Sequence, residues 1–208
     1  MGYELTQTLF IGRHTLLVEG PSDLLYLKSF SRQLETRGQA GLDYRWNISV
    51  LGGVDRIPGL VSLFRGNSHF IAAIADVQNG DKTKIDNARK RLPEGHLFTL
   101  DKYTGQKESD IEDVIGRDFY SALVTKSLGL QPAHQLSSAR PTGASDRVAK
   151  EAEEHCRTLP PHYLEFDHFV PAEWLFQNGD EGLNLPNANE ALERFSKLIS
   201  DINALVAK

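Results

Sequence analysis

The chain has 208 residues, of which 40% are apolar and 25% are charged, and its formal net charge is −5. A chain of this length and composition holds one globular domain, or one domain with a smaller appendage. The negative charge argues mildly against simple nucleic-acid binding, where a basic patch is expected, but not against an enzyme that gathers acids around metal ions.

The cysteine content and the length of the apolar stretches indicate in which cellular compartment the protein works. Cys156 is the only cysteine, which excludes an internal disulfide and fits a reducing cytoplasm. The longest apolar stretch, at 70–75, is far too short to span a bilayer, and no signal-peptide pattern is visible. We therefore expect a cytoplasmic protein without a membrane partner.

The first half of the chain alternates between two patterns. Apolar runs typical of strands lie at 15–19, 46–51, 69–76 and 96–100. Helical periodicity lies between them, at 21–35, 55–64 and 82–92. This alternation predicts βαβ units and a mostly parallel sheet. The later part is helical, with helices expected over 110–128, 145–158, 171–176 and 189–206. The expected fold class is therefore α/β, a mostly parallel sheet flanked by helices, plus a C-terminal helical subdomain.

Two expected strands end on a carboxylate. In "TLLVEGPSD" a buried strand ends on Glu19, and Gly20 and Pro21 then turn the chain into a helix that carries Asp23. In "FIAAIADVQNGDK" a strand buried on both faces ends on Asp76 before another glycine loop. If the two strands are neighbours, their carboxylates repel each other, and hard divalent cations relieve that repulsion.

A third acidic cluster occurs in "ESDIEDVIG". On a regular helix Asp110 and Asp113 share one face, whereas Asp110 and Glu112 do not. Asp110 and Glu112 reach one site only if Asp110 precedes the first helical turn. The open alternative is that Ser109 and Glu112 form a capping box, because acids favour helix N-termini.

These segments together resemble a TOPRIM domain. "LLVEGPSDLLYL", the strand that ends in an Asp loop, and "ESDIEDVI" are similar to the nuclease portion of the OLD (overcoming lysogenization defect) family, in the branch with an added helical subdomain. The resemblance covers about 12–120 and implies a TOPRIM-like catalytic core there. Residues 121–208 are then a helical portion packed on that core.

The resemblance implies a divalent-metal-dependent nuclease that cleaves DNA with two ions per site, Mg²⁺ or alternatively Mn²⁺ or Ca²⁺. Glu19 matches the invariant glutamate of the motif, Asp23 the acid one helical turn later, and Asp76 the first acid of an Asp-x-Asp element. Asp110 and Glu112 match acids that help to hold a second metal, and Asp113 shares that task. The second acid of Asp-x-Asp is missing, because residue 78 is a glutamine.

The family also uses a lysine from its C-terminal part. Lys150 is the candidate for this catalytic role, with Arg147 and Arg140 as nearby alternatives and an ordinary solvated lysine as the competing interpretation. OLD proteins usually carry an ATPase domain ahead of the TOPRIM part, whereas this chain has no G-x-x-x-x-G-K-[ST] motif. The implied partners are therefore DNA and an ATPase domain absent from this chain.

Other functions compete with this one. A non-catalytic TOPRIM module that binds DNA or a partner protein would keep the fold without needing three acidic clusters. An aspartyl-phosphate phosphatase fails because Gln78 stands where that chemistry needs an acid.

Two further groups of residues are candidates for nucleic-acid contacts. The late apolar cluster favours core packing over stacking on single-stranded bases; its members are Phe166, Phe169, Trp174, Leu175 and Phe176. The basic residues after the Asp76 loop favour a solvated face over phosphate binding; they are Lys82, Lys84, Arg89, Lys90 and Arg91.

Overall fold

The computed structural model describes residues 13–63, 70–139, 147–163 and 165–207. In these residues four parallel strands form one sheet in the order β2-β1-β3-β4. The strands are β1 (His14–Val18), β2 (Trp46–Val50), β3 (Phe70–Ala75) and β4 (Leu97–Thr99). The expected parallel α/β sheet is confirmed. Its two central strands are those that precede Glu19 and Asp76.

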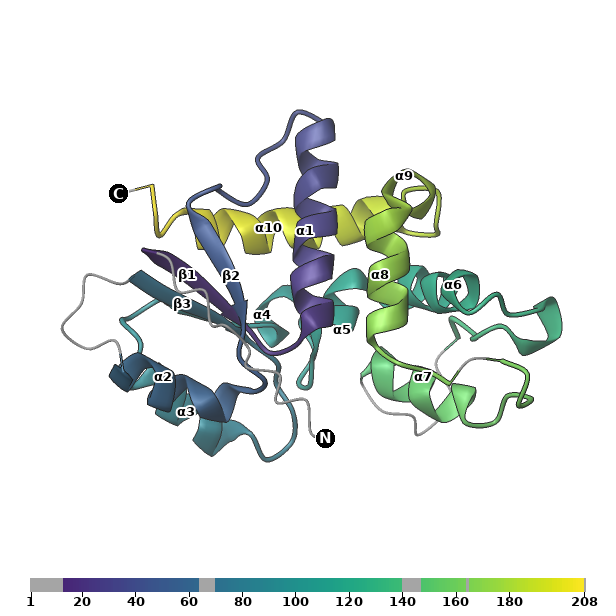
Figure 1. The fold of residues 1–208 in the computed structure, drawn as a ribbon, viewed down its shortest axis with the longest axis horizontal. Helices are drawn as coiled ribbons and strands as arrows, with labels where there is room; N and C mark the ends of the chain where they lie inside the picture. The colour runs from purple at the N-terminus through teal and green to yellow at the C-terminus, as the bar shows by residue number, and fades with distance from the viewer. Residues whose placement is uncertain (1–12, 64–69, 140–146, 164, 208) are drawn as a thin grey trace, which may run out of the picture.

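Helices cover both faces of the sheet (Figure 1). Leu16 and Ala72 belong to a large apolar core, which includes residues of α1 (Pro21–Thr36) and α10 (Ala188–Asn203). The alternate residues, Leu17 and Ala73, belong to a smaller core on the other face. That core is completed by η1 (Val54–Arg56), α2 (Ile57–Leu63) and α3 (Lys82–Arg89). Burial on both faces explains why β1 and β3 are continuous apolar runs rather than alternating ones.

The chain after β4 is helical. Its elements are α4 (Asp101–Thr104), α5 (Ile111–Ile115), α6 (Arg117–Ser127), η2 (Pro132–His134), α7 (Val148–Cys156), α8 (Phe169–Gln177), α9 (Gly179–Gly182) and α10. The single helix predicted over 110–128 is wrong, because Gly116 at φ 95° and ψ 151° separates α5 from α6. The short helices α4 and α9 have no counterpart among the expected elements.

The large core does not stop at the sheet. It continues through residues of α5, α6, α7 and α8, and α10 lies beside both α1 and α5. Phe30 of α1 stacks on Phe195 of α10, with ring centroids 4.0 Å apart. The predicted boundary near residue 120 falls inside α6.

Two surface expectations have different outcomes. Leu175 is buried, but Phe169 and Phe176 are 36% and 43% exposed, so core packing is wrong for these two phenylalanines. The five basic residues from 82 to 91 are exposed, as expected of a solvated face. Among the described segments, no helix has both the length and the apolar character needed to cross a bilayer.

Candidate metal and active site

The first two carboxylates meet at the carboxyl edge of the sheet. Because β1 and β3 are adjacent, the residues that follow them lie side by side. The backbone N–H of Asp76 donates to Oε1 of Glu19 at 3.0 Å. The expected proximity of Glu19 and Asp76 is thus present, and a direct hydrogen bond ties the two strand ends together.

Asp23 closes the turn after β1. Its Oδ2 accepts the backbone N–H groups of Glu19 at 3.0 Å and Gly20 at 2.9 Å. Gly20 is the N-cap of α1 and Pro21 occupies its first turn. The buried carboxylate of Asp23 therefore satisfies the backbone of the turn and stays beside Glu19.

A short antiparallel bridge brings in the third acidic cluster. Val77 and Ser109 exchange two backbone hydrogen bonds, each 2.8 Å long. Val77 follows Asp76 and Ser109 precedes Asp110, so the bridge holds these two aspartates near each other. This long-range pairing joins the acidic cluster of α5 to the strand ends.

The capping box at α5 uses a different pair from the expected one. Asp110 is the N-cap in an extended conformation, and its Oδ1 accepts the N–H of Asp113 at 3.1 Å. Asp113 returns the contact by accepting the N–H of Asp110 at 3.0 Å. The Ser109–Glu112 box is therefore wrong by one residue. Asp110 precedes the first helical turn, which is the condition for sharing a site with Glu112.

Asp113 and Arg147 connect this cluster to α7. The second carboxylate oxygen of Asp113 accepts the N–H of Val148 at 2.9 Å. Arg147 donates its Nε–H to Oδ2 of Asp110 at 2.8 Å. Lys150, by contrast, is exposed on α7. Arg140 lies outside the described residues.

His168 is a neighbour of the site that no motif of the sequence marks. Its Nδ1 lies 3.3 Å from Oε1 of Glu112, and its Nε2 lies 2.8 Å from Oε1 of Glu153. Glu112 is only 4% exposed. The hydrogen bond with Glu112 raises the pKa of His168 to about 9, so the imidazolium neutralises part of this buried charge at neutral pH.

Burial and mutual repulsion raise the pKa values of the carboxyl groups. Burial raises the pKa of Glu19 to about 7, that of Asp23 to about 6 and that of Glu112 to about 7. Burial, with Asp23 and Glu19 nearby, raises the pKa of Asp76 well above its usual value. The pKa of Asp113 rises to about 8, again mainly through burial. This concentration of disfavoured negative charge attracts cations.

Two more acids lie within electrostatic range of Glu19. The charges of Asp81 and Asp55 both raise its pKa. Asp55 follows the glycine pair after β2, and Asp81 follows the glycine loop after β3. The signal that could have found them is this position beyond the carboxyl ends of neighbouring strands, where ligands bind in open α/β sheets.

The donor chemistry fits a hard divalent cation. Glu19, Asp23, Asp76, Asp110 and Glu112 offer only oxygen ligands, which Mg²⁺ and Mn²⁺ prefer. Beside them lies the fully buried Tyr26, whose pKa is raised by burial and further by the charges of Glu112 and Asp23. As the side chains stand, however, no three His, Cys, Asp or Glu residues of the described segments converge closely enough to enclose an ion.

Solved structures share this fold. The C-terminal region of the Xanthomonas campestris pv. campestris OLD protein is 14% identical, with a TM-score of 0.54 over 92% of this chain and 98% of that one. The C-terminal region of the Burkholderia pseudomallei OLD protein is 10% identical, with a TM-score of 0.51 over 91% and 100%. No protein-family model and no curated protein matches the sequence. The chain thus has the fold of OLD C-terminal regions, as the resemblance implied.

Proposed function

We propose, from the fold shared with OLD C-terminal regions, that this chain is a divalent-metal-dependent DNA nuclease, the nuclease region of a system that also contains an ATPase. The convergence of three acidic segments at the carboxyl edge of β1 and β3 carries the proposal. If these acids served only as helix caps, burying them together would raise their pKa values and cost stability without any functional gain. The proposal includes a cytoplasmic location, where such a protein meets DNA.

The proposed ligands divide into two groups of oxygen donors. Glu19, Asp23 and Asp76 would hold one ion, and Asp110 and Glu112 would hold the second. When bound, the two ions supply activation of water and stabilisation of the leaving oxygen in an in-line displacement at phosphorus. Because the side chains do not enclose an ion as they stand, rotation of the Glu19 and Asp76 carboxylates is part of the proposal.

The other polar residues of the site position the proposed ligands and neutralise part of their charge. Both carboxylate oxygens of Asp113 accept backbone N–H groups, so we assign it to placing Asp110 and α7 rather than to metal binding. Asp110 stays a proposed ligand because its Oδ2 accepts from the Arg147 side chain, which can move, and not from the backbone. His168 fixes Glu112 through its bond to Glu153. Arg147 is already in contact with Asp110, which suits it to hold a scissile phosphate. Lys150 is exposed and becomes the weaker candidate for that role.

A non-catalytic module that binds DNA or a partner protein is the second candidate. Two observations favour it: the absence of a preformed three-residue metal group in the described segments, and the exposed Gln78 in place of an acid. Such a module would keep the fold and bind its partner without consuming DNA.

Plasmid cleavage separates the two candidates. Supercoiled plasmid is incubated with the chain in Mg²⁺, Mn²⁺, Ca²⁺ or EDTA, beside Asp76→Ala and the matched surface control Asp86→Ala. We expect metal-dependent nicking that Asp76→Ala reduces by about a hundredfold or more and Asp86→Ala leaves intact. Absence of cleavage with every metal, both alone and after addition of an OLD ATPase region, would favour the binding module.

A further inference from the structure

The exposed face of α1 carries positive charge away from the carboxylates. Lys28 and Arg32 are both exposed and stand one helical turn apart on the same face. Asp23, in the first turn of α1, belongs to the candidate site. With a rise of 1.5 Å per residue, Arg32 lies about 14 Å along the helix axis from Asp23. A basic stripe thus begins near the site and follows α1.

A cavity opens on the β2 side of this stripe. It has a volume of about 430 Å³, and its lining includes Lys28, Arg32, Tyr44 and Trp46. Tyr44 is 93% exposed, which is unusual for a residue with so much apolar surface. Trp46 is buried, and its indole Nε1 has no acceptor within the described chain.

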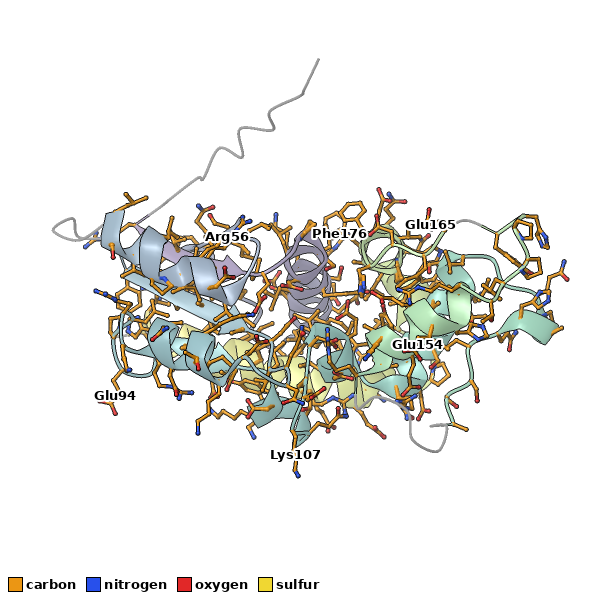
Figure 2. All side chains as sticks on the ribbon, turned by 90° about the horizontal axis from the view of Figure 1, so that it is seen from below. Arg56, Glu94, Lys107, Glu154, Glu165 and Phe176 are labelled. Atoms are coloured by element: carbon orange, nitrogen blue, oxygen red, sulfur yellow. The ribbon has the colours of Figure 1, made fainter. Side chains whose placement is uncertain are left out.

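A second cavity opens on the other side of α1, beside α8 and α9. Its volume is about 270 Å³, and Arg32, Gln33, Phe176 and Asn178 contribute to its lining. Figure 2, which looks roughly along α1, shows Phe176 at the surface beside this helix. Gln33 is buried, and its Oε1 has no donor within the parts of the chain described. Arg32 lines both cavities and so connects them across the helix.

We propose that this face of α1 binds single-stranded DNA, with Lys28 and Arg32 on phosphates and Tyr44 and Phe176 stacking on bases. A basic groove with aromatic platforms is how proteins hold single strands without reading sequence. Side chains on either side of one helix reach base faces only when the bases are unpaired, which favours a single strand over a duplex. The inference rests on the proposed function, because the bound strand would run along α1 toward the carboxylates of the candidate site.

The acids around the two cavities are partly neutralised. Asp43 forms an ion pair with Arg45 at 2.7 Å, and Glu181 forms one with Lys126 at 2.9 Å. Glu35 and Asp180 also contribute to the linings. Lys28 and Arg32 thus supply two positive charges beside these acids, and Glu35 stands one turn beyond Arg32 on α1. A site with so modest an excess of positive charge suits a single strand better than a duplex, whose charge density is higher.

Binding of a fluorescein-labelled oligothymidine, measured by fluorescence anisotropy in EDTA, tests the inference. All proteins carry Asp76→Ala, which prevents cleavage. We expect Lys28→Ala with Arg32→Ala to weaken binding by about tenfold or more and to lower the salt slope by about 1.4. Tyr44→Ala with Phe176→Ala should also weaken it by about tenfold. The control for the basic pair is Lys90→Ala with Arg91→Ala, and the control for the aromatic pair is Leu63→Ala. The affinity of both controls should stay within about twofold of the parent protein.

Two results would overturn the inference. One is equal affinity of the Lys28/Arg32 variant and its Lys90/Arg91 control. The other is a blunt duplex of the same length that competes better than the oligothymidine. Plasmid cleavage by the unmodified chain keeps the two proposals separate. If the unmodified chain cleaves plasmid but the α1 variants bind the oligothymidine normally, only this inference is contradicted. If the chain does not cleave but binding depends on α1, only the proposed nuclease activity is contradicted.

Discussion

Glu19, at the end of β1, both accepts a backbone hydrogen bond and contributes charge to the acidic site. Its Oε1 accepts the N–H of Asp76, and its carboxylate stands among other acids in a buried setting. The hydrogen bond lowers the pKa of Glu19, but burial and the charges of Asp23, Asp81 and Asp55 outweigh it. The ionised form therefore destabilises the metal-free fold, and that cost is the electrostatic reason to expect a bound cation.

Glu19→Gln tests this cost through pH. The pKa of Glu19 rises from 4.5 to about 7 on folding, so the native state binds more protons than the unfolded one in that interval. The contribution of Glu19 to metal-free stability should accordingly fall as pH rises from about 4.5 to about 7 and then level off, while Asp113, whose pKa is about 8, extends the fall of the whole protein to higher pH. Glu19→Gln should flatten this fall and raise stability at neutral pH by about 1–3 kcal/mol. Urea unfolding in EDTA across this pH range measures both effects, and a parallel profile for the variant would contradict the account.

Arg147 and Lys150 differ in their reach to the site. Arg147 donates a hydrogen bond to Asp110, whereas Lys150, three residues later in α7, is exposed. Arg147→Ala should lower the plasmid-cleavage rate by about a hundredfold, and Lys150→Ala should stay within about twofold. Steady-state nicking assays at saturating metal compare them, with Arg147→Lys as a test of the planar guanidinium. A larger loss in Lys150→Ala than in Arg147→Ala would reverse the assignment.

At the scale of elements, Gly116 is the residue that divides one expected helix into two. Its φ of 95° lies where side chains are strained, and an added Cβ would collide with Arg194. Arg194 itself donates to the carbonyl oxygens of Val114 and Ile115, so it caps the end of α5. The break orients α5 separately from α6 and lets its acidic N-terminus face the sheet edge.

Gly116→Ala should therefore cost about 2–3 kcal/mol of unfolding free energy, through both backbone strain and the Arg194 contact. Gly129→Ala is the matched control, because Gly129 has a φ of 61° but open space around its Cβ position. That control should lose only about 1 kcal/mol. Equal losses measured by chemical denaturation would show that the Arg194 contact contributes nothing.

The elements of the sheet were predictable from local pattern, and the contacts between acidic segments were not. The runs before Glu19 and Asp76 are apolar on both faces, which fixes them as buried central strands. The bridge between Val77 and Ser109 joins segments 32 residues apart in sequence through backbone groups alone, so no side-chain pattern announces it. Similarly, the contact of His168 with Glu112 joins residues 56 positions apart in sequence, and Gly116 looks like any glycine inside a helical pattern.

At the scale of the whole molecule, the sheet and the later helices share one large core. Phe195 of α10 is fully buried and stacks on Phe30 of α1, whose first turn carries Asp23. The helical portion thus supports the same helix that positions the candidate site. Loss of that packing should be felt at the carboxylates as well as in global stability.

Phe195→Ala should destabilise the whole chain by about 3–5 kcal/mol in one cooperative transition. Phe176→Ala, a matched change at a 43% exposed phenylalanine, should cost about 1 kcal/mol or less. Thermal unfolding followed by both near- and far-UV circular dichroism makes the comparison. Two separate transitions in Phe195→Ala would mean that the helical portion unfolds independently of the sheet.

The central claim is that the acidic residues at the carboxyl edge of β1 and β3 hold divalent metal, and the metal dependence of melting tests it most directly. The melting temperature of the unmodified chain is measured at neutral pH in EDTA and in excess Mg²⁺ or Mn²⁺, beside Asp76→Ala and the surface control Asp86→Ala. A site occupied at a hundredfold excess over its Kd adds about 2.7 kcal/mol, or about 5–10 °C for a chain of this size. We predict this rise in the unmodified chain and in Asp86→Ala, and its loss in Asp76→Ala. An unchanged melting temperature in every metal, or an equal rise in Asp76→Ala, would contradict the account.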